Sequence, residues 1–152
     1  MQAIARVNRV FKDKEGGLVV DYVVEDLPLD EYLELWSRAH VVVLPSMWEG
    51  VGFTFLEAIA GCKPIITVDA PPMNSYVLNR TGWLCKVKEF RRFERVNISG
   101  AVADVEDLSR LLVEACRDRE RISAYSRNTT ELRDMKSLEG SVDRLKQIFL
   151  GD

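Results

Sequence analysis

Two glutamates and two glycines lie close together in residues 45–64, PSMWEGVGFTFLEAIAGCKP. Gly50 and Gly52 follow an apolar run and precede a helix-like pattern. Glycines in such a turn let the backbone approach a ligand closely, and the N–H groups at the start of the next helix favour an anion such as phosphate. The glycines alone also fit a simple tight turn, because the stretch lacks the third glycine of the dinucleotide fingerprint and is not a Walker loop.

The two carboxylates make a ligand site the better interpretation. Glu49 and Glu57 are eight residues apart, which on a helix is on the order of 12 Å. This is too far for the acid pair of a retaining glycosidase, which needs about 5 Å. The spacing suits two carboxylates that bind separate hydroxyl groups, with a diphosphate between them, as in a nucleotide sugar. A purely solvated Glu57 fits poorly because its neighbours are apolar: Phe55, Leu56, Ala58, Ile59 and Ala60.

Alternating strand and helix patterns must position these residues. Predicted strands lie at residues 16–24, 41–45, 64–69 and 83–87. Predicted helices lie at residues 1–11, 29–40, 52–62, 73–79 and 105–119, followed by a helical C-terminal stretch over 121–128 and 141–150. This alternation predicts an α/β fold, a Rossmann-like parallel sheet with helices on both faces. Ligands bind beyond the carboxyl ends of such strands, where PSMWEGVG lies.

Composition excludes several classes of function. The chain has 152 residues, and its net charge of −3 does not favour nucleic acid as the main partner. Cys62, Cys85 and Cys116 are widely spaced and odd in number, so we expect no metal or disulfide framework and a reducing, cytoplasmic location. No apolar run reaches the length of a membrane span, and the N-terminus lacks a signal-like apolar core. We expect a single cytoplasmic domain.

The pattern PS-x-x-EG-x-G-x-x-x-x-EA-x-A-x-G-x-P resembles the C-terminal domain of group-one (family four) retaining glycosyltransferases of the GT-B fold, which include glycogen and sucrose synthases. The resemblance runs from about Val19 to the C-terminus and is loose after Val87. It implies that residues 1–152 form one donor-binding, C-terminal GT-B half. The matching residues are Pro45, Ser46, Glu49, Gly50, Gly52, Glu57, Ala58, Ala60, Gly61 and Pro64.

The resemblance also implies roles for individual residues. Glu49, in the catalytic position, would hold hydroxyls of the donor sugar near the reacting carbon, and Glu57 would accept hydrogen bonds from the ribose. No cofactor or metal is implied, because the helix dipole and basic side chains stabilise the leaving diphosphate of a UDP- or GDP-sugar. The implied donor-binding residues are Glu49, Gly50, Val51, Gly52, Phe53, Thr54 and Glu57.

The sequence departs from the family pattern at its N-terminal side. The N-terminal GT-B domain and the first strand and helix of this domain are missing, so we expect a truncated half or one that pairs with another subunit. Alone it should bind donor and barely transfer sugar, because the closed cleft places the acceptor and excludes water. The family's diphosphate-neutralising Arg and Lys are echoed loosely by Arg9 and Lys14, which also fit solvated charges at a helix end.

Other assignments stay open. The alternative function is a non-catalytic module that binds a nucleotide or nucleotide sugar and pairs with a separate catalytic half. A third alternative is a sugar-nucleotide epimerase or a phosphorylase. The Glu-x7-Glu spacing favours transferases, and the absence of the lysine context for a phosphate cofactor argues against a phosphorylase. Residues 86–102, KVKEFRRFERVNISGAV, have two interpretations. They would contact an acceptor phosphate, a partner or the inner membrane face with a lipid-linked acceptor, or they would form a solvated loop or hairpin. Their mixed charge favours the second. Trp48 would line a cleft or pack, and His40 would have a structural role at a helix end.

Overall fold

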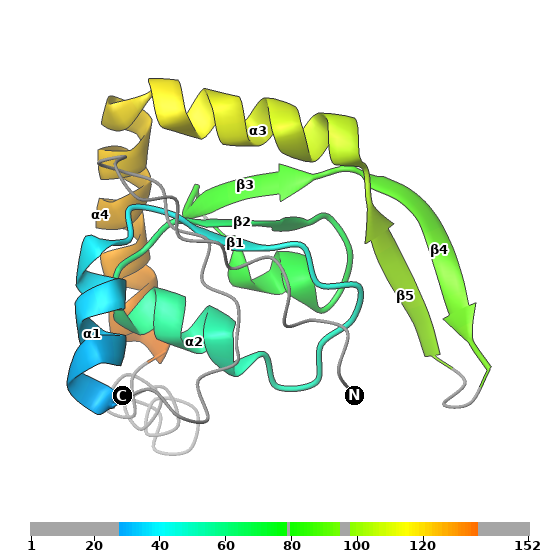
Figure 1. The fold of residues 1–152 in the computed structure, drawn as a ribbon, viewed down its shortest axis with the longest axis horizontal. Helices are drawn as coiled ribbons and strands as arrows, with labels where there is room; N and C mark the ends of the chain where they lie inside the picture. The colour runs from blue at the N-terminus through cyan, green and yellow to red at the C-terminus, as the bar shows by residue number, and fades with distance from the viewer. Residues whose placement is uncertain (1–27, 79, 95–97, 137–152) are drawn as a thin grey trace, which may run out of the picture.

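The computed structural model describes residues 28–78, 80–94 and 98–136 (Figure 1). The predicted helix at 1–11, the predicted strand at 16–24 and the last predicted helical segment at 141–150 lie outside the described residues. Arg9 and Lys14 lie outside them as well.

The centre of the fold is a parallel sheet of three strands in the order β1-β2-β3. The strands are β1 (Val42–Leu44), β2 (Ile65–Val68) and β3 (Gly82–Cys85). Every residue of β1 and β2 is buried, because helices cover both faces of the sheet and each strand is a continuous apolar run. The predicted parallel sheet is confirmed.

Helices pack on both faces of this sheet, as predicted (Figure 1). The helices α1 (Leu29–Arg38) and α2 (Phe53–Ala60) cover one face, where Trp36 and Phe55 share a core with Val42. The helix α3 (Val105–Arg117) covers the other face, where Leu111 packs with Ile66. The helix α4 (Arg119–Lys136) contributes residues to both cores, so it closes one end of the sheet.

An antiparallel hairpin follows β3 directly and extends past the carboxyl end of the sheet (Figure 1). It consists of β4 (Val87–Phe93) and β5 (Ile98–Ala103), with Phe90 opposite Ala101 and a register shift between Val87 and Glu89. Such a shift is typical of a β-bulge, which bends a strand and increases its twist. The hairpin is one of the two conformations expected for this segment.

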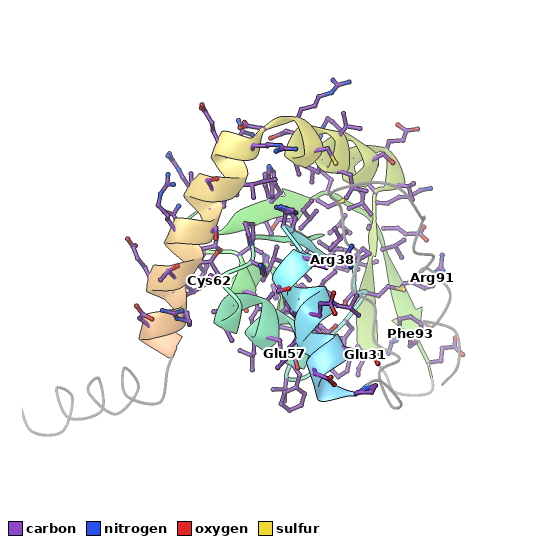
Figure 2. All side chains as sticks on the ribbon, turned by 60° about the vertical axis from the view of Figure 1, so that its left-hand side comes forward. Glu31, Arg38, Glu57, Cys62, Arg91 and Phe93 are labelled. Atoms are coloured by element: carbon purple, nitrogen blue, oxygen red, sulfur yellow. The ribbon has the colours of Figure 1, made fainter. Side chains whose placement is uncertain are left out.

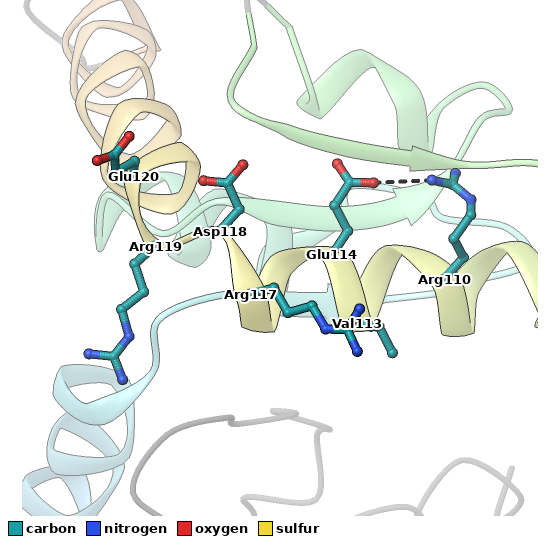
Figure 3. Close-up of a pocket in the computed structure, with 7 residues that line it drawn as sticks. All are labelled: Arg110, Val113, Glu114, Arg117, Asp118, Arg119 and Glu120. Atoms are coloured by element: carbon teal, nitrogen blue, oxygen red, sulfur yellow. Dashed lines mark hydrogen bonds and ion pairs between the residues drawn. The ribbon is translucent and has the colours of Figure 1, made fainter.

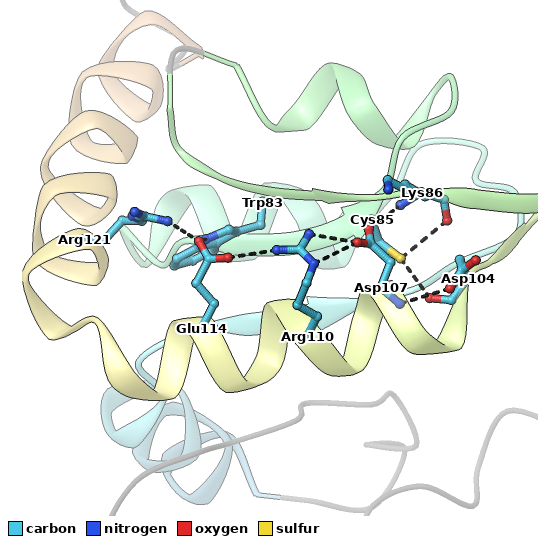
Figure 4. Close-up of polar contacts among 8 residues, drawn as sticks. All are labelled: Trp83, Cys85, Lys86, Asp104, Asp107, Arg110, Glu114 and Arg121. Atoms are coloured by element: carbon cyan, nitrogen blue, oxygen red, sulfur yellow. Dashed lines mark hydrogen bonds and ion pairs between the residues drawn. The ribbon is translucent and has the colours of Figure 1, made fainter.

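A polar network connects the end of β3 to α3 (Figure 4). The Asp104 side chain accepts a hydrogen bond from the Asp107 N–H at 2.9 Å and so caps the N-terminus of α3. The buried Asp107 carboxylate accepts from the Lys86 N–H at 2.9 Å and from the Arg110 guanidinium at 2.8 Å. The Lys86 hydrogen bond, and then the Arg110 contact, hold the pKa of Asp107 below its usual range. The base of the hairpin is therefore fixed to α3.

Candidate functional site

The stretch between β1 and α2, residues 45–52, is called the site loop below. It leaves the sheet at the carboxyl end of β1, the position at which α/β folds bind ligands. Its starting point is fixed by the buried Thr67 of β2, whose Oγ1 donates to the Leu44 carbonyl at 2.7 Å. The loop therefore begins from a rigid position in the sheet.

Gly52 ends the site loop and is the N-cap of α2. Its φ of 63° lies in the left-handed region, which favours glycine. An added Cβ would lie 3.1 Å from Phe55 Cδ2 and 3.2 Å from Tyr76 Oη, so both the conformation and the space require glycine. Gly50, the other glycine of the motif, is exposed.

The N-terminus of α2 carries no side-chain cap hydrogen bond and no acidic residue in its first turn. The N–H groups of Phe53 and Thr54 have no carbonyl within the helix to bind, because they belong to its first turn. The macrodipole adds partial positive charge at the same place. Among the described residues this helix start therefore carries N–H donors that no acidic side chain of its first turn neutralises, and the binding of an anion there stays a prediction.

Glu57 lies one turn into α2 (Figure 2). The residue is half-buried, yet its Oε2 atom is fully buried and has no hydrogen-bond partner among the residues that the structure describes. This burial raises the pKa of the carboxyl. A buried acceptor without a donor costs free energy, which a bound hydroxyl would offset.

Tyr76 supports the far end of the site loop, and no sequence pattern had indicated it. Its hydroxyl donates to the Val51 carbonyl at 2.6 Å, and its ring stacks on Phe55 with centroids 4.6 Å apart. Tyr76 ends the short 3-10 helix η1 (Met73–Tyr76), which confirms a short helix here, although it ends before the predicted residue 79. The available signal was position, because η1 follows the carboxyl end of β2 and the same sheet edge carries the site loop.

The near end of the site loop is held by the hairpin, a second contact that the sequence did not indicate. The Ala101 N–H donates to the Met47 carbonyl at 2.7 Å. Glu49, half-buried, lies two residues further along the loop. The apolar side chains of Trp48, Val51 and Phe53 are 50%, 58% and 69% exposed, so this part of the surface is apolar and open.

Features elsewhere in the described residues do not form a competing site. A pocket of about 780 Å³ lies where α3 meets α4 (Figure 3), and its arginines alternate with Glu114, Asp118 and Glu120. Within the described ranges, no group of three or more histidine, cysteine, aspartate or glutamate side chains is arranged to hold a metal ion. His40 lies exposed beyond the end of α1. None of the helices described combines the length and apolar character needed to cross a membrane.

Comparison with known proteins gives one match that covers most of the chain. The family model described as glycosyl transferases group 1 matches residues 22–129, a range that includes the site loop, the three parallel strands and the hairpin. A local likeness was also found to a protein of Methanocaldococcus jannaschii named as a type I restriction enzyme MjaIXP endonuclease subunit. It is 86% identical over 22 residues, which are 14% of this chain and 2% of that protein. A match this short carries no functional assignment.

Proposed function

The chain belongs to the glycosyl transferases of group 1, and from that premise we propose that its site loop and α2 form the donor site of a retaining glycosyltransferase. The donor is a nucleotide-diphosphate sugar such as a UDP- or GDP-sugar. One observation carries the proposal: a buried Glu57 carboxylate oxygen, which has no hydrogen-bond partner among the described residues, lies one turn into a helix whose N-terminus has no side-chain cap. Together they offer acceptors for hydroxyl groups and donors for a diphosphate.

Each part of the donor has a proposed partner. The ribose hydroxyls donate to the Glu57 carboxylate, whose Oε2 has no donor in the described ranges. The diphosphate accepts hydrogen bonds from the N–H groups at Gly52, Phe53 and Thr54. The sugar hydroxyls donate to Glu49, at the other end of the site, with Gly50 and Val51 forming the backbone between them.

The same arrangement supports transfer. When the bond between the anomeric carbon and the diphosphate oxygen breaks, negative charge develops on the leaving diphosphate, and the N-terminus of α2 stabilises it. An acceptor hydroxyl then bonds to the anomeric carbon on the face that the diphosphate leaves and gives its proton to the departing diphosphate oxygen, so the configuration is retained. The proposed reaction needs no metal and no cofactor. Basic side chains that complete the neutralisation would come from elsewhere, with Arg9 and Lys14 as the candidates in this chain.

We infer that the acceptor is placed by an N-terminal GT-B domain or a partner subunit. Trp48, Val51 and Phe53, all half or more exposed, supply apolar surface for that contact. Residues 1–152 are then a single donor-binding domain that transfers little sugar alone. The free Cys62, Cys85 and Cys116 support a cytoplasmic location, and a lipid-linked acceptor would bring the domain to the inner membrane face.

Titration calorimetry of the 152-residue chain with UDP, GDP, ADP and their sugars tests the donor site. We expect at least one of these ligands to bind at submillimolar concentration, and Glu57→Ala to weaken it strongly. The matched control is Glu131→Ala, which removes an exposed glutamate from α4. If no ligand binds at millimolar concentration, the donor-site proposal is wrong. Sugar transfer by the chain alone would instead contradict the claim that it needs a second domain.

A further inference from the structure

The edge of β5 that faces away from β4 contacts the site loop directly. Ala101 lies opposite Phe90 in the hairpin, yet its N–H donates to the Met47 carbonyl at 2.7 Å rather than to β4. The site loop therefore runs beside β5 as an extra backbone segment. Ala101 itself is 2% exposed and belongs to the main core, so this attachment point does not move independently of the sheet.

Gly100 sets the distance between the hairpin and the loop. A Cβ at this position would lie 3.2 Å from Met47 Cβ and 3.3 Å from the Met47 carbonyl oxygen. It would also lie 2.7 Å from Cε2 of Phe93, the far end of a side chain that is 39% exposed and able to turn away. The Met47 backbone has less freedom. A glycine is thus needed here for a close approach of two backbones.

The site loop is held from both sides of Glu49. Before Glu49, the Met47 carbonyl accepts from β5, and after it, the Val51 carbonyl accepts from the Tyr76 hydroxyl at 2.6 Å. The base of the hairpin is fixed in turn by the Asp104 N–H, which donates to the Lys86 carbonyl at 2.9 Å. Glu49 and Gly50 are therefore the middle of a short segment with two fixed ends.

We propose that β5, through Gly100 and the Ala101 N–H, is the positioning element for Glu49 at the sugar end of the donor site. What Glu49 binds rests on the proposed function, whereas the dependence of the loop on the hairpin does not. Displacing Met47 moves the sugar partner, while Glu57 and the N–H groups of α2 stay in place. The protein then loses affinity for the sugar and keeps its affinity for the nucleoside diphosphate.

The test compares Gly100→Ala and Gly100→Val with Ser99→Val in the full chain. Ser99 is the exposed neighbour on the opposite face of β5, so its replacement changes the strand without pressing on Met47. The loop is monitored by ¹⁹F NMR of 5-fluorotryptophan at Trp48, assigned with Trp48→Phe. The Trp48 ring lies over Gly50, 3.8 Å from where a Cβ of that residue would be, and so reports on the loop.

We expect the Trp48 resonance to shift in Gly100→Ala, to shift further in Gly100→Val and to stay in place in Ser99→Val. UDP-glucose and GDP-mannose are then compared with UDP and GDP. For the pair that binds, Gly100→Val should weaken the sugar nucleotide about tenfold, roughly 1.4 kcal/mol. The corresponding diphosphate should change less than twofold.

Three results would overturn the proposal. The first is an unmoved Trp48 resonance in folded Gly100→Ala, the milder variant to use if Gly100→Val does not fold. The second is full restoration of that resonance by Phe93→Ala in the Gly100→Ala background, because the pressure would then pass through the ring and not through Met47. The third is equal weakening of sugar nucleotide and diphosphate. Failure of the wild type to bind any nucleotide would refute the donor site instead, and the Trp48 shift would still decide the positioning role.

Discussion

Glu57→Gln should improve the stability of the ligand-free protein and impair donor binding. The Glu57 residue is half-buried, and within the described part of the chain its Oε2 has no hydrogen-bond donor. Its pKa is raised above 4.5 because burial desolvates the charge, so in the folded state the ionised form is the unfavourable one. Glutamine has nearly the same shape without the charge, and it can direct its oxygen inward and its amide N–H groups to solvent.

The direction of the pH dependence follows from proton linkage. Between 4.5 and the raised pKa, the folded state binds more protons than the unfolded state, so stability falls as pH rises through this window. The cost is absent below the unfolded pKa and fully present above the folded pKa. Thermal unfolding should therefore show Glu57→Gln to be more stable than wild type at pH 7.5, with a difference that shrinks toward pH 4.5.

Donor binding should respond in the opposite sense. A hydrogen bond to a charged group contributes about 1.5–3 kcal/mol, and a neutral one about half of that. Loss of one charged bond in Glu57→Ala corresponds to roughly 10- to 150-fold weaker binding, and Glu57→Gln, which loses about half of that free energy, to roughly 4- to 13-fold. Calorimetry across pH should also show wild-type affinity falling on acidification, because a protonated Glu57 accepts less well.

Two results would refute this reasoning. Donor affinity of Glu57→Ala within twofold of wild type would mean that the carboxylate does not bind the ligand. A Glu57→Gln variant that is equally destabilised at pH 7.5 and pH 4.5 would mean that the buried charge carries no cost. Glu131→Gln on the exposed face of α4 is the matched control, and neither its stability nor its donor affinity should change measurably.

Three further changes give distinct results. Gly52→Ala should cost about 1–3 kcal/mol of unfolding free energy in urea titration, because alanine must adopt the left-handed conformation; an unchanged midpoint would contradict this. Tyr76→Phe should cost about 1 kcal/mol and weaken donor binding, because the Val51 carbonyl loses its donor; unchanged affinity in calorimetry would remove Tyr76 from the site. Asp107→Asn should cost about 2 kcal/mol at pH 7. Because the pKa of Asp107 is lowered from 3.8, the ionised aspartate stabilises the fold above pH 3.8 and loses that effect as pH falls through the lowered value. The unfolding free energies of wild type and Asp107→Asn should therefore converge in acid. A difference that does not change with pH would exclude the charge as the cause.

Local sequence patterns were sufficient to predict the helices and strands and to select the candidate site residues. The apolar runs at β1 and β2 and the glycines before α2 are all features of neighbouring residues. The burial of Glu57 was also foreseeable, because apolar residues surround it in the helix. The roles assigned to Glu49, Glu57 and the backbone between them remain predictions.

The contacts that hold the site loop could not be predicted in this way. The Tyr76 hydroxyl reaches Val51 across 25 residues of sequence, and the Ala101 N–H meets Met47 only because the hairpin turns beside the sheet edge. Neither contact leaves a periodic signal. Gly100 in the sequence is equally compatible with a turn, a bulge or a close approach, and only the positions of Met47 and Phe93 distinguish these.

The two fixed ends of the site loop have a consequence for the thermodynamics of ligand capture. The segment between Met47 and Val51 is ordered by β5 and Tyr76 when the chain folds, so its conformational entropy is lost before any ligand arrives. A ligand that enters then forgoes little further freedom in this segment, and preorganisation of this kind raises affinity without adding a contact. The hairpin and the short 3-10 helix thus contribute to binding by ordering the ligand-free protein.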